Sequence, residues 1–288
     1  MSYLIYSYRK LADKIHEYWV EAPRIAAKHF AGQFVILRLN EHGERIPLTV
    51  VETNKKNGQI RLIVQEAGKT TEDFAHLKAG DFILDVVGPL GQATHIQNWG
   101  NLVVIGGGVG SAPLLPIAKA AKAGGNKVHA ILGARSKELL LLTDEFEAVC
   151  DETRICTDDG TFGTKGFVTN LLDSWGQEGV KFDFGIAVGP VQMMKAAEKT
   201  MSQWNIPGMA SLNPIMVDGT GMCGACRVTV HGKTRFACVE GPEFDIHGVD
   251  FNELILRNRS YTHEEHEAVE HAHQCQLNEM IHHARTEA

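Results

Sequence analysis

Three cysteines near the C-terminal end of the chain have a spacing that suits a metal centre. Cys223 and Cys226 are separated by two residues, and Cys238 follows after eleven more. Asp218 precedes Cys223 with four residues between them, so the pattern is Asp-x4-Cys-x2-Cys-x11-Cys. A plant-type [2Fe–2S] cluster is held by Cys-x4-Cys-x2-Cys and a more distant fourth cysteine. The spacing therefore predicts an iron–sulfur site with Asp218 in the place of the first cysteine.

Two alternatives to this iron–sulfur site stay open at the level of the sequence. Zinc also binds three cysteines with a fourth ligand, for which His231 is a candidate. In the other alternative Asp218 only caps a turn, and water or another residue completes the site. The remaining cysteines are interpreted as buried or incidental thiols, namely Cys150, Cys156 and Cys275.

A glycine-rich stretch, IGGGVGSAPLLP at Ile105–Pro116, joins an apolar strand to a helix. Gly106 and Gly108 fit the dinucleotide pattern Gly-x-Gly-x-x-Gly, but Ser111 replaces its last glycine. The order of strand, glycine turn and helix favours a pyrophosphate site over a simple tight turn. At the end of the next strand, Arg135 is a candidate for holding an adenine, a ribose or a 2′-phosphate, which leaves NAD and NADP both open.

Three other stretches have features that suit a phosphate-bearing or nicotinamide ligand. RIPLT, Arg45–Thr49, offers a cation and a hydroxyl, although a solvated arginine on a strand is the simpler interpretation. QEAGKTT, Gln65–Thr71, places Gly68 before amides that open a helix, although a capped helix start would look the same. VGP, Val188–Pro190, follows a strand and is either a nicotinamide border or only a strand-to-helix turn.

The elements that must position these residues change in kind near Asn101. Before it, apolar strand-like segments separated by turn residues predict a small antiparallel β barrel. After it, strands alternate with helices, one of them over 137–150, which predicts a doubly wound parallel α/β sheet whose last strand ends in VGP. A hairpin around His231–Gly232 and a polar tail follow. The predicted parts are a barrel at 1–97, an α/β domain at 98–210, a [2Fe–2S] domain at 211–258 and a tail at 259–288.

Composition limits the classes of partner. The chain of 288 residues has 44% apolar and 22% charged residues and a net charge of −7, which argues against a nucleic-acid partner. Residues 86–118 lack charged side chains, but their glycines and prolines favour buried strands and loops over a membrane helix. The N-terminus has no signal-peptide pattern, so we expect a cytoplasmic protein whose cysteines need not form disulfides.

The tail is rich in histidine. It holds six of the fourteen histidines, namely His263, His266, His271, His273, His282 and His283. Such a tract can bind metal. Apolar residues near helical spacing favour instead a Glu/His-faced helix that packs on the domain or on a partner.

Taken together and in order, these motifs resemble the flavin reductase subunits of the ferredoxin–NADP reductase superfamily that carry a C-terminal [2Fe–2S] domain. The resemblance covers nearly everything but the tail and rests on FAGQFV, RIPLT, QEAGKTT, GPLG, GGGVGSAP, LGARS, TDDGTFGTKG and VGPVQMM. Two groups within this superfamily are similar to this sequence. The electron-transfer subunits of dihydroorotate dehydrogenases present four cysteines to their cluster. The small subunits of NADH-dependent ferredoxin:NADP⁺ oxidoreductases use three cysteines and an aspartate, which Asp218 matches.

This resemblance implies three groups of site residues. It implies FAD at Arg45, Pro47, Leu48, Thr49, Val64, Gln65, Gly68, Thr70 and Thr71. It implies NAD(H), with NADP(H) as the alternative, at Gly107, Gly108, Gly110, Arg135, Asp158, Gly189 and Pro190. It implies the cluster at Asp218, Cys223, Cys226 and Cys238.

The resemblance also implies a mechanism and a partner. Hydride would pass between NAD(H) and the flavin N5, and single electrons would then pass through the cluster. The partner would be a larger subunit with its own FAD and [4Fe–4S] clusters, similar to the small subunit of glutamate synthase, in a complex that couples NADH, NADPH and ferredoxin by electron bifurcation. A dihydroorotate- or sulfide-linked reductase is the alternative enzyme, and a zinc-binding or nucleotide-sensing module without catalysis is the alternative class.

Overall fold

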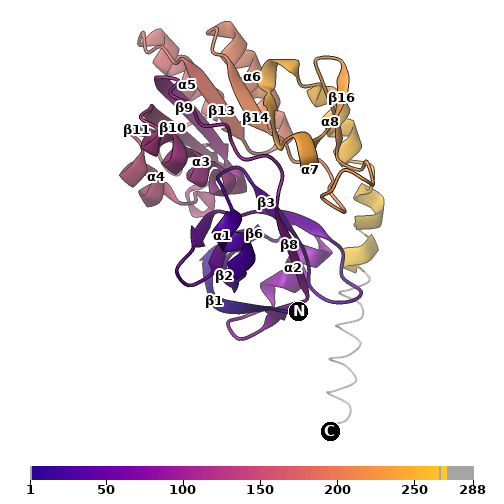
Figure 1. The fold of residues 1–288 in the computed structure, drawn as a ribbon. Coiled ribbons are helices and arrows are strands. Elements are labelled where there is room, and N and C mark those ends of the chain that lie inside the picture. Colours follow the sequence, from indigo (N-terminus) through magenta and orange to yellow (C-terminus); the bar gives the residue numbers. More distant parts are fainter. Residues whose placement is uncertain (1, 266, 271–288) are drawn as a thin grey trace.

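The computed structural model describes residues 2–265 and 267–270, which form three packed parts along the chain (Figure 1). An antiparallel β part comes first, an α/β part follows, and a small segment with the cysteines packs beside both. The predicted fold class is confirmed. None of the helices among the described residues is long and apolar enough to cross a membrane.

The first part consists of two antiparallel sheets around one core. The sheet orders are β5-β6-β2-β1-β7 and β4-β3-β8. The strands are β1 Tyr3–Ala12, β2 Ile15–Glu21, β3 Phe34–Arg38, β4 Ile46–Thr49, β5 Glu52–Asn54, β6 Gln59–Gln65, β7 Phe82–Ile83 and β8 Asp85–Leu90. Two short helices, α1 Pro23–Lys28 and α2 Lys69–Ala75, lie beside them. The sequence did not predict α1, whose six residues are too short for a helical pattern to emerge.

Strand β6 is buried on both faces, and each face has a different partner. Ile60, Leu62 and Val64 belong to the core between the two sheets. Since side chains alternate along a strand, Arg61 and Ile63 point the other way, toward the α/β part. Ile63 accordingly joins the hydrophobic cluster of the α/β part. This second face is what brings the barrel into contact with its neighbour.

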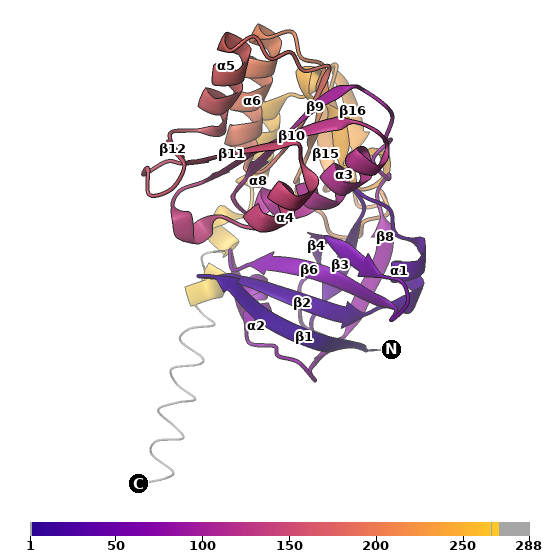
Figure 2. The ribbon, with the colours of Figure 1, turned by 90° about the vertical axis from the view of Figure 1, so that its left-hand side faces the viewer.

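The second part is a seven-stranded sheet of order β12-β11-β10-β9-β13-β14-β17. Its strands are β9 Asn101–Gly107, β10 Lys127–Ala134, β11 Glu152–Thr157, β12 Thr164–Lys165, β13 Phe184–Val188, β14 Gly208–Ser211 and β17 Glu243–Asp245. All pair in parallel except β17. Figure 2 shows α3 Ser111–Ala123 and α4 Thr143–Val149 on one face, and α5 Val168–Gln177 and α6 Val191–Gln203 on the other.

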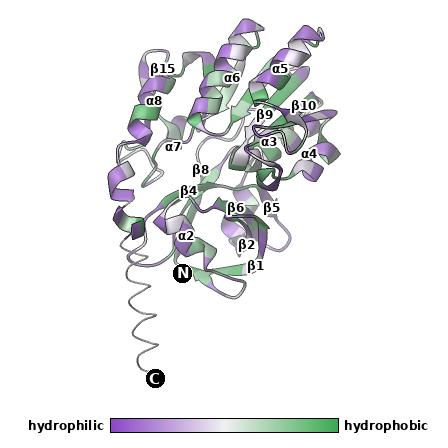
Figure 3. Ribbon diagram, turned by 180° about the vertical axis from the view of Figure 1, so that it is seen from behind, coloured by the Kyte–Doolittle hydropathy of each residue, from purple (hydrophilic) through white to green (hydrophobic). Residues whose placement is uncertain are grey.

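The chain reverses its direction of travel across this sheet at β9. Strands β10 and β11 lie on one side of β9, and β13 and β14 lie on the other. At such a switch point the connections after neighbouring strands diverge and leave a crevice at the carboxyl ends. The strands are mainly hydrophobic and the helices carry hydrophilic outer faces, as Figure 3 shows. The fold thus places the glycine-rich turn after β9 beside the VGP turn after β13.

Two sequence predictions about this sheet are wrong. The strand that ends in VGP is not the last, because β14 and β17 extend the sheet beyond it. Both are short, at four and three residues, so they leave little apolar pattern. The helix predicted over 137–150 is also interrupted. Only Lys137–Leu139 forms a 3-10 turn, Leu142 adopts a left-handed φ of 59°, and α4 starts at Thr143.

The third part carries the cysteines. The hairpin predicted around His231–Gly232 is present as β15 Arg227–Val230 and β16 Lys233–Phe236. Helix α7 Ala237–Glu240, β17, a 3-10 turn at Ile246–Gly248 and α8 Phe251–Asn258 follow. Residues 262–265 and 267–270 are helical, and most of the predicted tail helix lies outside the described residues. Of the tail histidines His263 is described, whereas His266, His271, His273, His282 and His283 lie outside the described residues, as does Cys275.

The cysteine segment is packed against both other parts. Strand β17 pairs with β14, and Gln92 at the end of the barrel donates its backbone N–H to the Gly241 carbonyl at 2.7 Å. Phe34 and Ile36 of β3 share one hydrophobic cluster with Cys226 and Cys238. The boundaries between the four predicted parts remain predictions, since β17 lies in the third part but completes the sheet of the second.

His29, at the end of α1, makes the stability of the fold sensitive to acid. Its side chain is buried, its Nε2 has no hydrogen-bond partner, and burial lowers its pKa to about 4. In the unfolded chain the His29 imidazole takes up a proton once the pH falls below its ordinary pKa near 6.5, whereas in the folded protein it stays neutral down to about pH 4. The contribution of neutral His29 to the free energy of unfolding is therefore fully present above pH 6.5 and is lost as the pH falls to about 4. The loss amounts to about 3 kcal/mol.

We therefore expect His29→Leu to reduce the loss of stability between pH 6.5 and pH 4. The measurement is the urea midpoint as a function of pH. His42→Leu, at an exposed histidine, is the matched control and should keep the wild-type dependence. Equal pH slopes for the two variants would contradict this account of His29.

Candidate functional site

A cavity of about 950 Å³ lies between the barrel and the carboxyl edge of the parallel sheet. Eleven of the residues predicted for flavin or nucleotide binding line it: Pro47, Leu48, Thr49, Gln65, Gly107, Gly108, Gly110, Arg135, Asp158, Gly189 and Pro190. Residues from both large parts thus meet at one space. A ligand in this cavity would contact the barrel strands on one side and the glycine-rich turn on the other.

The barrel wall of the cavity comes from β4 and β6. Pro47, Leu48 and Thr49 of β4 line it, whereas Arg45, just before the strand, is exposed and outside the lining. Gln65 ends β6 and also lines it, but the Val64 side chain points into the barrel core, so only its backbone is available to a ligand.

The turn at Gly68 lies outside the cavity lining and is stabilised locally. The Thr71 hydroxyl accepts hydrogen bonds from the backbone N–H groups of Ala67 (2.8 Å) and Gly68 (3.0 Å). The Thr70 hydroxyl donates to the Glu44 carboxylate at 3.0 Å. These contacts describe a capped helix start, so flavin binding by Gly68, Thr70 and Thr71 remains a prediction.

The nucleotide wall depends on two turns that approach very closely. A Cβ atom on Gly110 would lie 2.5 Å from the Val188 carbonyl oxygen and 2.6 Å from the Cα of Gly189. A Cβ atom on Gly107 would lie 2.5 Å from the Met193 sulfur. At Gly110 the neighbours are backbone atoms, so only glycine allows the turn after β9 and the turn after β13 to pack this tightly, whereas the atom closest to Gly107 belongs to the flexible Met193 side chain.

Arg135 and Asp158 lie at the mouth of the cavity, at the ends of β10 and β11. Both are exposed. Backbone bonds from Asp158 N to Ala134 O (3.0 Å) and from Asp159 N to Arg135 O (3.2 Å) hold the two turns together. A cation and a carboxylate thus flank the same opening, which is suited to a ribose and leaves the choice between NAD and NADP open.

The cysteine loop has two buried thiols and one exposed thiol. The Cys226 and Cys238 sulfurs are 3.2 Å apart and both residues are almost fully buried, whereas Cys223 is exposed. The Cys238 backbone N–H points at the Cys226 sulfur at 3.5 Å. Gly219, Gly221 and Gly224 all have positive φ, a backbone conformation that glycine adopts at no steric cost.

These features fit an iron–sulfur cluster. Burial raises the pKa of the Cys238 thiol to about 12, so this thiol needs a cation to become the thiolate that iron requires. Backbone amides such as that of Cys238, which points at the Cys226 sulfur, lower the cost of negative charge on the sulfurs. His231, the candidate zinc ligand, instead hydrogen-bonds the Asp245 carboxylate at 2.8 Å. Among residues 2–265 and 267–270, no three His, Cys, Asp or Glu side chains already converge as metal ligands.

Asp218 is engaged within the loop. One carboxylate oxygen accepts the Thr220 N–H at 2.8 Å and the other accepts the Cys223 N–H, also at 2.8 Å. The turn-capping alternative therefore has direct geometric support. Each carboxylate oxygen keeps a further lone pair, so ligation of iron by Asp218 stays a prediction.

The cavity and the cysteine loop share a wall. Ile36 of β3 is the cross-strand partner of Pro47, which lines the cavity. A Cβ atom on Gly219, in the cysteine loop, would lie 2.9 Å from the Ile36 Cγ1 atom. Asn213 also lines the cavity, and the chain reaches Asp218 five residues later. Two paired positions of one sheet, Pro47 and Ile36, therefore lie against the cavity and the cysteine loop respectively.

Several residues of the cavity were missed at the level of the sequence. Ser211 ends β14 and Asn213 follows it, and the short pattern of this strand was not recognised. Ile63 shares one face of β6 with Gln65, so strand alternation was the signal that could have identified it. Phe167 and Thr169 enter the cavity from the start of α5, which no motif indicated.

Family models and known proteins agree with this arrangement. Residues 12–95 match the model of the oxidoreductase FAD-binding domain, and residues 213–250 match that of the iron–sulfur cluster binding domain of dihydroorotate dehydrogenase B. The fold and these two domains define a flavin- and iron–sulfur-containing oxidoreductase with a ferredoxin reductase-like fold.

The chain belongs, more narrowly, to the family of the electron-transfer subunits of dihydroorotate dehydrogenase B and their homologues. A homologue of that subunit from Thermotoga maritima is 49% identical over 256 residues, covering 89% of this chain and 90% of its own length. The subunit from Geobacillus thermodenitrificans is 32% identical to this chain. The match covers 83% of this chain and 94% of that subunit. A chain in the solved structure of the NADH-dependent reduced ferredoxin-NADP oxidoreductase is 47% identical, with a TM-score of 0.89 over 93% of this chain and 96% of that one.

Proposed function

We propose that this subunit passes electrons between NAD(H), FAD and a [2Fe–2S] cluster and delivers them to a larger flavoprotein in electron-bifurcating, NADH-dependent ferredoxin:NADP⁺ oxidoreduction. The observation that carries the proposal is the shared wall, because the paired residues Pro47 and Ile36 of one sheet lie against the cavity and the cysteine loop respectively. The similarity to the bifurcating oxidoreductase chain supports the choice of reaction.

The residues of the chain have distinct tasks in this proposal. The turn at Gly107–Gly110 and the VGP turn hold the nucleotide, while β4 holds the flavin ring against it. FAD supplies the conversion of a hydride pair into single electrons when it is bound. Ile36 is buried and fills the space toward the cysteine loop, so it keeps water out of the interval between the two sites.

Exposed apolar residues at the edge of the cysteine loop support the proposal that another protein docks there. Met222 is 87% exposed, and Val217 and Val239 are also exposed apolar residues near the cysteines. Exposed apolar residues around a redox site suit a docking contact. We propose a larger subunit with FAD and [4Fe–4S] clusters, similar to the glutamate synthase small subunit, with ferredoxin as an indirect partner. A cytoplasmic setting remains a prediction.

The experiment that tests the function is anaerobic reduction of the purified protein by NADH, followed by absorption. We expect flavin bands with a broad iron–sulfur shoulder, and bleaching of the flavin before the shoulder. A colourless, zinc-containing protein would reject the enzyme in favour of a binding module. Co-purification of a dihydroorotate-oxidising partner, identified by peptide mapping, would favour the alternative enzyme indicated by the subunit relatives.

Asp218 is tested with two substitutions that separate its two roles. Asp218→Asn keeps an oxygen that can accept the Cys223 N–H, but it removes the negative charge. Asp218→Cys restores the plant-type ligand pattern. If Asp218 binds iron, we expect both variants to shift the midpoint potential of the cluster, because an oxygen ligand is harder than a thiolate. Redox titration with electron paramagnetic resonance measures this. An unchanged potential in both variants would assign Asp218 to turn capping alone.

A further inference from the structure

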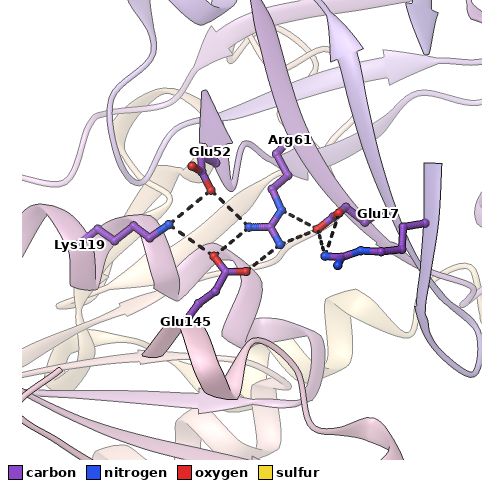
Figure 4. A network of polar contacts seen from close by, with 6 residues as sticks. Glu17, Glu52, Arg61, Lys119 and Glu145 are labelled. Atoms are coloured by element: carbon purple, nitrogen blue, oxygen red, sulfur yellow. Dashed lines mark hydrogen bonds and ion pairs between the residues drawn. The ribbon is translucent and has the colours of Figure 1, made fainter. Parts of the chain in front are cut away.

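The barrel and the α/β part are joined by a second contact, next to the cavity and distinct from it. Arg61 of β6 lies in the middle of this contact, and its side chain is only 5% exposed. Around it are three carboxylates and one lysine, with Glu17 and Glu52 on the barrel and Lys119 and Glu145 on α3 and α4 (Figure 4).

Arg61 makes a two-pronged hydrogen bond to the opposite part. Its Nη2 and Nη1 atoms donate to the two carboxylate oxygens of Glu145 at 2.8 Å and 3.0 Å. Its Nε atom donates to Glu17 at 2.7 Å, within the barrel. Burial by itself raises the pKa of the Glu145 carboxyl, but the bond from Arg61 and its charge lower it overall. Lys119 adds weaker contacts to Glu52 (3.3 Å) and Glu145 (3.4 Å).

The rest of this contact is apolar and has no directional preference. Ile15, Val51 and Ile63 from the barrel pack in one cluster with Leu115 and Ala118 of α3. Apolar packing resists separation but does not define an angle, because hydrophobic attraction is non-directional. A two-pronged arginine–carboxylate bond does define one. Arg61 and Glu145 therefore form the bond with the most defined geometry at this contact between the two parts.

The elements held by this contact also line the cavity, one on each side. Ile63 and Gln65 follow Arg61 on the same face of β6 and line the cavity, with Ile63 only about 7 Å farther along the strand. On the other side, Lys119 belongs to the same helix as Ala112 and Pro113, which line the cavity directly after the glycine-rich turn. A small rotation at Arg61 would thus change the distance between the two cavity walls.

We propose that Arg61 is a positioning residue for hydride transfer, which it serves by holding α4 and α3 against the barrel so that flavin and nicotinamide meet at reacting distance. This proposal rests on the proposed function, since it requires both rings to occupy the cavity. Reacting atoms tolerate little displacement, and an error of about 1 Å costs roughly 100-fold in rate.

The test compares Arg61→Met with Arg154→Met in the purified holoprotein. Arg154 is a suitable match, because it also makes a two-pronged bond, to Glu178 at 2.6 Å and 2.7 Å, and a bond to Glu152 at 2.8 Å, but entirely within the α/β part. The readouts are FAD content, the limiting rate of flavin reduction by NADH, the NADH dissociation constant, the charge-transfer absorption of the stacked rings, and amide hydrogen exchange in α4.

We expect Arg61→Met to keep its FAD and to bind NADH within about threefold of wild type, while the limiting rate falls about 10- to 100-fold. Charge-transfer absorption should weaken and exchange in α4 should rise. Arg154→Met should keep the wild-type limiting rate even if it unfolds at a lower temperature. Arg61→Lys, which keeps the charge without the fork, should lie between wild type and Arg61→Met.

An unchanged limiting rate in Arg61→Met, or an equal decrease in Arg154→Met, would overturn the positioning role and leave a structural one. If Arg61→Met does not fold, Glu145→Gln provides the same test, because Arg61 then keeps Glu17 as its partner. Wild-type protein that NADH does not reduce would overturn the proposed function itself, which distinguishes the two failures.

Discussion

Cys223→Ala is expected to abolish the iron–sulfur absorption while the flavin bands remain. Cys223 is the exposed cysteine of the loop, so its truncation removes a candidate ligand without opening a cavity in the core. Loss of a mere supporting contact around a metal typically costs 10- to 100-fold in affinity, so loss of a ligand should cost at least about 100-fold. NADH should still reduce the flavin, and transfer to a one-electron acceptor that draws on the cluster should decrease by a similar factor.

The measurements are iron content, absorption, and the separate rates of flavin reduction and of electron delivery. Cys150→Ala is the matched control, since Cys150 is a half-buried thiol at the end of α4 and outside the cysteine loop. It should retain the cluster and both rates. A full cluster in Cys223→Ala would remove Cys223 from the ligand set and would require a different interpretation of the Cys-x2-Cys spacing.

Gly110→Ala should have the second-largest effect, on the nucleotide. The added methyl group would lie 2.5 Å from the Val188 carbonyl oxygen, and this neighbour is backbone and not a side chain that can rotate away. The turns after β9 and β13 must then separate. Overpacking of this kind costs about 1–3 kcal/mol of stability. A displacement near 1 Å at the nucleotide also predicts a roughly 100-fold slower reduction of the flavin by NADH.

Gly68→Ala is the control for the added methyl group, because Gly68 is extended and a Cβ atom there would have no neighbouring atom within 4 Å. It should unfold at the wild-type temperature, and it serves as a control for stability alone, since Gly68 is itself a predicted flavin-binding residue. Thermal unfolding compares both variants, and NADH titration and stopped-flow reduction measure Gly110→Ala. Wild-type kinetics in Gly110→Ala would show that the two turns can separate without consequence for the nucleotide.

The local motifs of this chain were predictable because each depends on neighbouring residues. The glycine-rich turn, the VGP turn and the hairpin at His231–Gly232 are defined by a few consecutive residues with special backbone requirements. The change from strands to alternating strands and helices near Asn101 also predicted the order of the first two parts. The family resemblance implied flavin on the barrel and a nucleotide at the glycine-rich turn, and residues from both places line one cavity.

Other features depend on residues far apart in the chain and left no local signal. Arg61 and Glu145 are 84 positions apart, and neither belongs to a motif. Strand β14 finds its partner β17 only after the cysteine loop has been traversed. The hydrogen bonds of Asp218 are local. Spacing alone could not tell whether Asp218 accepts hydrogen bonds from backbone N–H groups or binds iron, because both roles use the same carboxylate at the same position.

The pairing of β17 with β14 has a consequence for how the chain is made. The α/β sheet is closed at that border by residues Glu243–Asp245, which are synthesised after every other strand of the sheet. Until they arrive, β14 presents an unpaired edge of the kind that recruits other chains. A nascent or truncated protein that stops before Glu243 should therefore aggregate even though its nucleotide turns are already formed. The cysteine segment thus supplies the border strand of the sheet. It could not be replaced by an independent domain without exposing the edge of β14.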